Sequence, residues 1–143
     1  MLRSLWPLLL PLPLMTGTTV RPAPASGATV VHIGDLDDQT DPSTGGGKIT
    51  PTVGVWVHGP DHRGVYRARV QAVWSGSVSG TARCETDQDG YCALQTRKAY
   101  PNEQGLQMVL RIRTVEGDGM EYDKSANHDP DRDSDGTVIR ITR

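Results

Sequence analysis

Apolar residues recur at every second position in four segments of the chain, and this period restricts the possible folds more than any other feature. The segments are 53–57, 68–74, 106–112 and 139–141. In the second segment, Val70, Ala72 and Trp74 follow one face, while Arg69 and Gln71 follow the other. Successive side chains of a β-strand point to opposite faces, so each segment predicts a strand with one buried face.

The stretches between these segments predict how the strands assemble. The chain of 143 residues contains 16 glycines, 10 prolines and no phenylalanine, and no segment shows the apolar stripe of a helix. Short alternating segments separated by Gly, Pro and Asp are typical of strands joined by tight turns. We therefore expect an all-β fold, built as an antiparallel β-sandwich.

The first residues have the organisation of a secretory signal peptide. Arg3 precedes a leucine-rich run that is interrupted by proline and is too short to span a bilayer. The sequence "APA" at 23–25 satisfies the small-x-small rule of a cleavage site. We expect a signal peptide over residues 1–25, a single domain over residues 26–143 and a soluble product that is secreted, extracellular or periplasmic.

Charge and hydropathy limit the partners of such a product. The net charge is −2, and removal of Arg3 and Arg21 would make it more negative, whereas nucleic-acid binding requires a basic surface. No later apolar stretch is long enough to span a membrane. We therefore expect no nucleic-acid partner and no membrane contact after cleavage, and instead an extracellular protein or surface polymer as the partner.

Cys84 and Cys92 are the two cysteines of the chain. In an exported protein such a pair predicts a disulfide with a structural role, and the alternative of a metal pair lacks the C-x-x-C spacing. Between them, "DQDG" predicts a type I turn that begins at Asp87 and ends with Gly90 in the left-handed conformation. We therefore expect a hairpin whose two strands the disulfide joins near the tip.

Three motifs carry a resemblance to a known family. The sequences "VHIGDLD", "TARCETDQDGYC" and "YDKSANHDPDRDSDGTVI" resemble a small immunoglobulin-like domain of secreted bacterial proteins, often found at the C-terminal end of larger extracellular proteins that include proteases. The likeness extends over residues 31–142. It implies an immunoglobulin-like sandwich of about seven strands with an accessory, non-catalytic role. Arg132 stands where the family more usually has Gly. An antibody-type disulfide joins two sheets beside a Trp, and the expected hairpin disulfide lacks that arrangement.

The sequence "ANHDPDRDSDGT" at 126–137 is the segment that most suggests ion binding. Its aspartates occupy every second position and are Asp129, Asp131, Asp133 and Asp135. Such a loop can supply the oxygen ligands that calcium requires, with help from Asn127 and backbone carbonyls. An EF-hand is not expected, because Thr142 stands where the final glutamate should be. The alternative is a turn in which the aspartates cap their own backbone amides.

Asp35 and Asp37 are further candidate ligands, in the acidic segment 34–48. In an immunoglobulin-type order, successive strands alternate in direction. A loop after the first strand then lies at the opposite pole from the loop before the last strand. The two acidic clusters are therefore far apart if residues 30–33 are the complete first strand, and meet if these residues are only an entry segment. The sequence leaves both arrangements open.

The histidines and the absence of a catalytic motif complete the functional interpretation. His32, His58, His62 and His128 lack the spacing of a helical zinc motif and are interpreted as surface residues. No nucleophile motif such as G-x-S-x-G is present, so no catalytic residue is assigned. We expect a non-catalytic binding or structural module, rigidified by calcium at the Asp-rich loop. The alternative is a small inhibitor or accessory factor of an extracellular enzyme, with 117–136 as the protruding segment.

Overall fold

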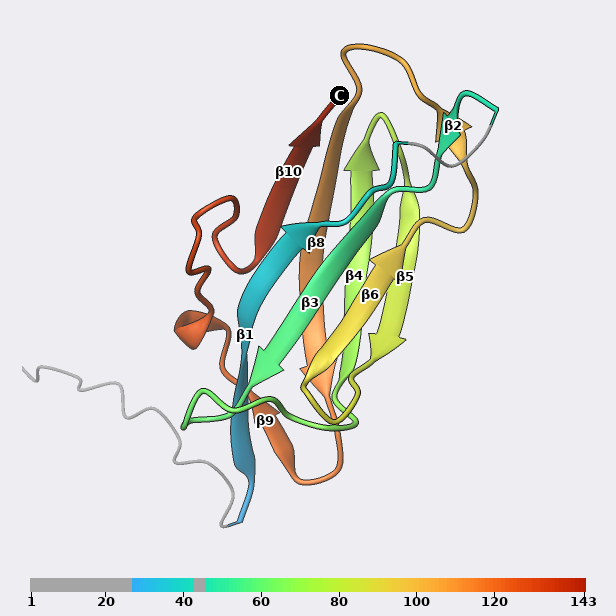
Figure 1. The fold of residues 1–143 in the computed structure, drawn as a ribbon. Helices are drawn as coiled ribbons and strands as arrows, with labels where there is room; N and C mark the ends of the chain where they lie inside the picture. The colour runs from blue at the N-terminus through green and yellow to red at the C-terminus, as the bar shows by residue number, and fades with distance from the viewer. Residues whose placement is uncertain (1–26, 43–45) are drawn as a thin grey trace, which may run out of the picture.

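The computed structural model describes residues 27–42 and 46–143, so the predicted signal peptide lies outside the described residues. Ten strands and one short 3-10 helix follow one another in this part of the chain (Figure 1). They are β1 Thr29–Asp38, β2 Lys48–Ile49, β3 Thr52–His58, β4 Arg69–Gly76, β5 Gly80–Glu85, β6 Tyr91–Gln95, β7 Tyr100–Pro101, β8 Gln107–Glu116, β9 Met120–Tyr122, η1 Lys124–Ala126 and β10 Val138–Thr142. None of the helical segments in these ranges has the length and apolar character that a membrane crossing requires.

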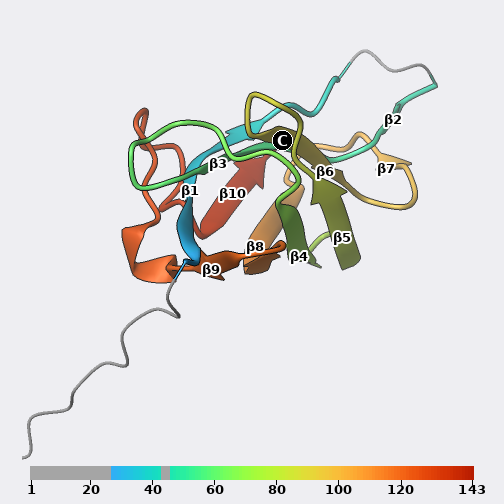
Figure 2. The same cartoon turned by 90° about the horizontal axis from the view of Figure 1, so that it is seen from below.

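The longer strands form two sheets that pack face to face. One sheet has the order β6-β3-β1-β9 and the other β10-β8-β4-β5, while β2 and β7 form a separate ribbon. The pairing of β1 with β9 is parallel, and the other strand pairings are antiparallel. The two layers are visible when the molecule is seen from below (Figure 2). The prediction of an all-β sandwich is confirmed, whereas the immunoglobulin-like type stays a prediction.

The core between the sheets includes the alternate residues that the sequence pattern singled out, together with residues of β1, β5 and β6. Val53, Val55 and Val57 of β3 are fully buried, as is Val70 of β4, and Trp74 of β4 is 2% exposed. Strands β8 and β10 contribute Met108, Leu110, Ile112, Ile139 and Ile141. These side chains belong to a single hydrophobic cluster, and removing such apolar surface from water is the main stabilising contribution to a sandwich of this kind.

Strand β1 is longer than the sequence pattern predicted, because the acidic segment continues it through Asp38. A bulge between Ile33 and Asp35 shifts the pairing with β3, so Ile33 and Leu36 both face the core. The side chains of Asp35 and Asp37 are therefore carried on the outer face of the strand. Residues 30–33 are only the first half of β1, and residues 34–38 are strand rather than connection.

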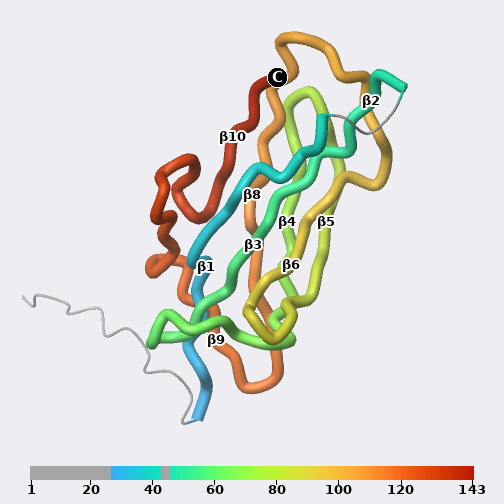
Figure 3. The backbone as a smooth tube through the Cα atoms, viewed as in Figure 1, coloured from blue at the N-terminus to red at the C-terminus, as the bar shows by residue number. Residues whose placement is uncertain are grey.

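Most of segment 117–136, considered above as a protruding segment, follows the edge of β1. It contains the single turn of η1 and strand β9, which brings the two sheets to eight strands where about seven were predicted. The N–H of Asp123 donates to the carbonyl of Val31 at 2.9 Å, and the N–H of His128 donates to the carbonyl of Ile33 at 3.1 Å. Figure 3 shows this segment lying beside β1 along much of its length. Backbone hydrogen bonds therefore attach the segment to the sheet edge.

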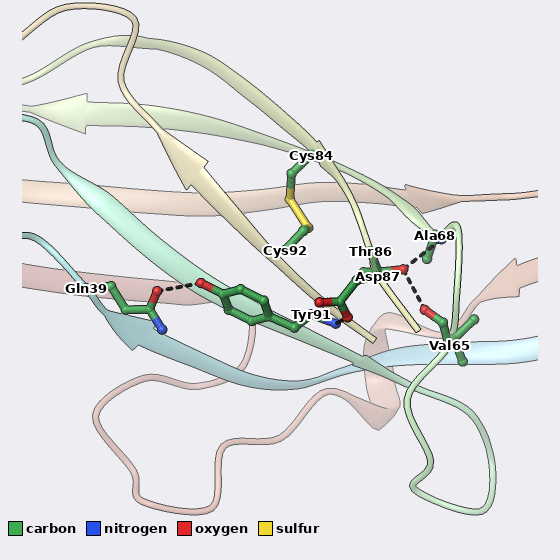
Figure 4. The surroundings of a disulfide bond; sticks show 8 residues. All are labelled: Gln39, Val65, Ala68, Cys84, Thr86, Asp87, Tyr91 and Cys92. Atoms are coloured by element: carbon green, nitrogen blue, oxygen red, sulfur yellow. Dashed lines mark hydrogen bonds between the residues drawn. A yellow bond between two sulfur atoms is a disulfide. The ribbon is translucent and has the colours of Figure 1, made fainter. Parts of the chain in front are cut away.

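Cys84 and Cys92 form a disulfide, and the predicted turn between them is also present (Figure 4). The N–H of Gly90 donates to the carbonyl of Asp87, and Gly90 has a φ of 79°. The predicted strand pairing is wrong. β5 pairs with β4, and β6 pairs with β3, so the disulfide joins the edges of the two sheets.

A buried threonine explains why the two strands diverge. The hydroxyl of Thr86 accepts a hydrogen bond from the N–H of Ala68 at 2.9 Å and donates to the carbonyl of Val65 (Figure 4). These contacts hold the end of β5 against the chain that enters β4. The chain then crosses to the other sheet through the turn. The expectation that this protein lacks an inter-sheet disulfide is therefore also wrong.

Candidate metal centre

The four histidines of the sequence lie together beside the first sheet. His32 is on β1, His58 ends β3, His62 is in the connection 59–68, and His128 is in the segment 127–137 between η1 and β10. In Figures 2 and 3 this connection and this segment lie on the same side of the molecule, next to β1. One ring nitrogen from each histidine lies within 4.8 Å of the others, and the ring centroids are 5.1 to 6.4 Å apart. We call this group the histidine cluster.

Strand pairing accounts for half of the histidine cluster. His32 and His58 are directly opposite each other in the antiparallel pairing of β1 with β3, which places their side chains side by side. Gly34 leaves the space that the ring of His58 occupies, because a Cβ at Gly34 would lie 2.1 Å from Nδ1 of His58. A larger residue in this bulge would therefore displace the imidazole.

The other two histidines are held by tight turns. The N–H of His62 donates to the carbonyl of Gly59 at 3.1 Å, and His62 has the left-handed φ of 58°. Gly136, with a φ of 72°, packs against the backbone of His128, where a Cβ would lie 2.6 Å from the carbonyl oxygen. Gly136 thus turns the chain and also leaves room for the backbone of His128.

Burial favours the neutral form of two of these imidazoles. His32 is 5% exposed, and its pKa is lowered below 6.5 by burial first and then by the neighbouring imidazoles, of which His128 acts most strongly. The pKa of His58 is lowered in the same way, by burial and then by His128 and His62. Nε2 of His32 and Nδ1 of His58 are buried without a hydrogen-bond partner in the described ranges. Neutral imidazole nitrogens are the form that binds a metal ion.

Two groups of carboxylates lie on the same outer face of β1. The first consists of Asp35, Asp129 and Asp131, and the second of Asp37, Asp131 and Asp133, with oxygens within 4.8 Å of one another in each group. Asp131 is common to both, and we call the two together the acidic groups. Because Asp129 directly follows His128 in the chain, the acidic groups adjoin the histidine cluster. Three-carboxylate groups of this kind have the donor atoms to hold a metal ion.

The backbone of segment 127–137 curls so that three of its aspartates converge. Arg132 adopts the left-handed conformation, with a φ of 68°, and its N–H donates to Oδ1 of Asp129 at 2.8 Å. The hydroxyl of Ser134 donates to the other oxygen of Asp129. Asp135 lies apart from both acidic groups, and its Oδ1 accepts the N–H groups of Thr137 and Val138 at 2.8 and 2.6 Å. Asp135 therefore caps a turn, which was the alternative interpretation for the whole run.

The crowding of like charges is visible in the pKa values. Burial, followed by repulsion from Asp37, Asp129 and Asp131, raises the pKa of Asp35 to about 6. Burial and then the charges of Asp131 and Asp129 likewise raise the pKa of Asp133 to about 6. The pKa of Asp37 is also raised, by burial and then by Asp131 and Asp129. For Asp129, hydrogen bonds from Ser134 and its neighbours outweigh the opposing effect of burial and lower the pKa.

The structure joins the acidic residues that the sequence left as two separate clusters. Asp35 and Asp37 reach the Asp-rich segment because β1 extends past residue 33 and the segment runs back along its edge. Asn127, expected to assist calcium, instead holds the segment in place. Its Oδ1 accepts the N–H of Ile33, and its Nδ2 donates to the side chains of Tyr122 and Thr137.

The interpretation of the histidines as surface residues is wrong for His32, which is almost completely buried. His58 and His62 are four positions apart. This spacing was compared only with that of a zinc motif on a helix. In the sequence, His32 and His128 closely precede the two acidic motifs, and His58 and His62 flank the sequence "GPD". The pairing of strands that are distant in the chain brings these histidines together.

Comparisons with protein-family models, with curated protein sequences and with solved structures gave no match to this chain. The class of protein is therefore defined by the fold and the site alone: a disulfide-linked β-sandwich with carboxylate groups that could hold a metal ion.

Proposed function

We propose that this protein is a secreted, non-catalytic binding or structural module of the immunoglobulin-like type, rigidified by calcium at the acidic groups. Calcium is bound by six to eight oxygen atoms, and carboxylates are its commonest protein ligands. The acidic groups combine two side chains of β1 with three from segment 127–137. An ion held there would attach the Asp-rich segment to the sheet.

The observation that carries this proposal is the sharing of Asp131 between two carboxylate groups whose oxygens lie within 4.8 Å of one another. Arg63 pairs with Asp61 and Arg143 pairs with Asp38, and neither of these ion pairs involves the acidic groups. Oδ1 of Asp35 is buried without a hydrogen-bond partner in the same part of the chain. Like charges so close favour either a bound cation or protonation. At neutral pH, calcium would be the bound cation.

Export draws support from the cysteines. Disulfides persist in oxidising compartments, which agrees with the signal-peptide-like start of the sequence. The inhibitor alternative draws little support, because the segment that should protrude is hydrogen-bonded along β1. An extracellular protein or surface polymer remains the proposed partner.

The test is thermal unfolding of the purified protein with calcium and with chelator. We expect a dissociation constant of about 10⁻⁴ to 10⁻³ M, typical of extracellular calcium sites. At a calcium concentration ten times the dissociation constant, binding would stabilise the fold by about 1.4 kcal/mol. For a domain of this size that corresponds to a rise in Tm of roughly 3–8 °C.

The variant D131N/D133N should lose the rise in Tm, because it removes the shared ligand and a second carboxylate. The matched control is D89N/D118N, which makes the same change of charge at two residues outside the acidic groups. It should keep the full rise. Equal melting curves with and without calcium for the unmodified protein, together with no heat in a calorimetric titration, would refute the calcium proposal.

A further inference from the structure

We propose that the histidine cluster is a second and chemically distinct metal site, in which four imidazoles bind one Zn²⁺ ion. The cluster draws on β1, β3 and two separate connections, and its nitrogens converge within 4.8 Å. The cluster takes in each of the histidines in the sequence. The inference does not depend on calcium binding at the acidic groups.

The donor atoms decide which class of ion the cluster would take. Calcium and magnesium prefer oxygen ligands, whereas imidazole nitrogen suits zinc, copper and nickel. The cluster consists of imidazoles alone, and the neighbouring carboxylates belong to the acidic groups. The histidine cluster therefore favours zinc, copper or nickel, whereas the acidic groups favour calcium or magnesium.

A second, independent observation points to a ligand at this place. His32 is 95% buried, at a relative exposure of 5%, yet its Nε2 has no hydrogen-bond partner in the described residues. Nδ1 of His58 is buried and unpartnered as well. Buried polar atoms in native proteins are almost always satisfied, and an unsatisfied one calls for an ion or water. A metal ion between these nitrogens would satisfy both.

The orientation of the rings favours convergence on a point over stacking. The plane of His62 is nearly perpendicular to those of His32, His58 and His128, at 80°, 88° and 77°. In a tetrahedral zinc site with bonds of about 2.0–2.1 Å, the nitrogens lie about 3.3 Å apart. The nitrogens of the cluster lie within 4.8 Å of one another, which is compatible with that spacing after small adjustments. His62 and His128 stand on connections and not on paired strands, so they are the residues that can make such adjustments.

The number of ligands also predicts the role of the ion. Structural zinc sites use four protein ligands, whereas catalytic sites keep one coordination position open for water or substrate. With four imidazoles bound, no position remains open. The zinc ion would therefore be structural, fixing connection 59–68 and segment 127–137 to the strands that carry His32 and His58.

The test uses the purified protein after removal of metals with a chelator and dialysis. Calorimetric titration with Zn²⁺ should show one ion per chain and a dissociation constant below about 1 μM. Replacement of zinc by Co²⁺ should give the intense visible absorption of a tetrahedral ion. Weak absorption typical of six-coordinate Co²⁺, or a dissociation constant above about 100 μM for Zn²⁺, would overturn the proposal.

The variant His62→Asn is the sharpest single change. His62 is exposed and has a positive φ, which asparagine tolerates better than most residues, so folding should be preserved. Loss of an outer-sphere partner of a metal ligand already costs about 10–100-fold in affinity, so loss of a ligand should cost at least about 100-fold. Circular dichroism of the metal-free variant verifies the fold, and His128→Gln provides a second variant. Unchanged zinc affinity in either folded variant would overturn the proposal.

The variant D131N/D133N separates this proposal from the calcium proposal. It should bind Zn²⁺ as the unmodified protein does while losing its response to calcium, and His62→Asn should show the reverse. Zinc binding that disappears in D131N/D133N and persists in His62→Asn would place the ion in the acidic groups and refute the four-imidazole site. Failure of calcium binding alone would leave the zinc result intact.

Discussion

Single carboxylates in the acidic groups have a stability contribution that depends on pH. The pKa of Asp35 is raised from 3.8 to about 6 in the folded protein, so the folded state holds this proton more tightly than the unfolded state. The resulting stability is fully present below about pH 3.8 and is lost as the pH rises through 6. At neutral pH the ionised side chain therefore opposes folding unless a cation is bound.

We predict that Asp35→Asn raises the Tm of the calcium-free protein at pH 7.5 and has little effect at pH 3.5. The reason is that asparagine removes a charge that is absent at the lower pH in any case. Thermal melts in chelator at the two pH values measure the effect, with the exposed Asp89→Asn as control. A lower Tm for Asp35→Asn at pH 7.5 would contradict the electrostatic argument.

Two of the histidines give the stability of the fold a pH dependence opposite to that of Asp35. Their contribution must be separated from that of Asp35. The pKa values of His32 and His58 are lowered below 6.5 in the folded protein. The stability associated with their neutral forms is therefore present above about pH 6.5 and is lost as the pH falls through the folded pKa values. Comparing variant with unmodified protein at each pH cancels this contribution, since both contain the same histidines.

Arg132 occupies a conformation that the sequence already suggested would be unfavourable. Its φ of 68° lies in the left-handed region, which costs a non-glycine residue roughly 1–2 kcal/mol. Glycine there would relieve the strain, although its greater freedom in the unfolded chain offsets about 0.5–1 kcal/mol. We predict that Arg132→Gly raises the free energy of unfolding by up to about 1 kcal/mol, measured by urea denaturation.

Arg140→Gly is the matched control for that change, because Arg140 is an exposed residue of β10 with ordinary extended pairing to Val109. Glycine in a strand interior weakens the strand, so this variant should lose stability. If both glycine variants lose stability to the same extent, the left-handed conformation of Arg132 is not a source of strain.

At the scale of elements, the disulfide acts between edge strands of different sheets. Cys84 and Cys92 are separated by 8 positions, and closing so short a loop is worth about 2.5 kcal/mol in the chain-entropy model. We predict that replacing both cysteines by alanine lowers the Tm on the order of 10 °C without abolishing the fold. β5 and β6 retain their own pairing partners, β4 and β3.

Hydrogen exchange can show which strands lose stability in the alanine variant that lacks the disulfide. Amide protection should fall at β5 and β6 and persist at the centre of β1 and β3, because the disulfide links only the sheet edges. Labelling of the native protein with a thiol reagent should show no free cysteine. An unchanged Tm in the alanine variant, or free thiols in the native protein, would contradict a stabilising role.

The extension of β1 shows how one element determines the site. The bulge at Gly34 allows Ile33 and Leu36 to remain in the core while His32, Asp35 and Asp37 stay outside. Without the bulge, the alternation would place Leu36 or the acidic residues on the wrong face. The sequence "VHIGDLD" is therefore both a core strand and a row of ligands.

At the scale of the whole molecule, the histidine cluster and the acidic groups form one polar strip on the outer face of the first sheet. His32, Asp35 and Asp37 follow one another along β1, and His128, Asp129 and Asp131 follow one another along the facing segment. The inner face of the same sheet is packed on the hydrophobic core. Strand β1 thus carries three of the proposed ligands and the segment hydrogen-bonded to its edge carries four, while His58 on β3 and His62 in connection 59–68 complete the histidine cluster.

Features that depend on local periodicity and local turns follow from the amino-acid sequence alone. The alternating segments predicted β3, β4, β8 and β10, "DQDG" predicted the turn with Gly90, and the cysteine count indicated the disulfide. Asp129, Asp131 and Asp133 were identified as candidate ligands from their spacing alone. These features are fixed by residues close together in the chain, so their physical cause can be seen in the sequence.

Contacts between residues distant in the chain are visible only in the folded protein. The pairing of β5 and β6 with different partners, the meeting of Asp35 and Asp37 with the Asp-rich segment, and the convergence of the four histidines all depend on long-range contacts. His32 and His128 are far apart in the chain, yet a backbone hydrogen bond to Ile33 places them side by side. Such contacts are set by strand register and packing, which local sequence patterns do not specify.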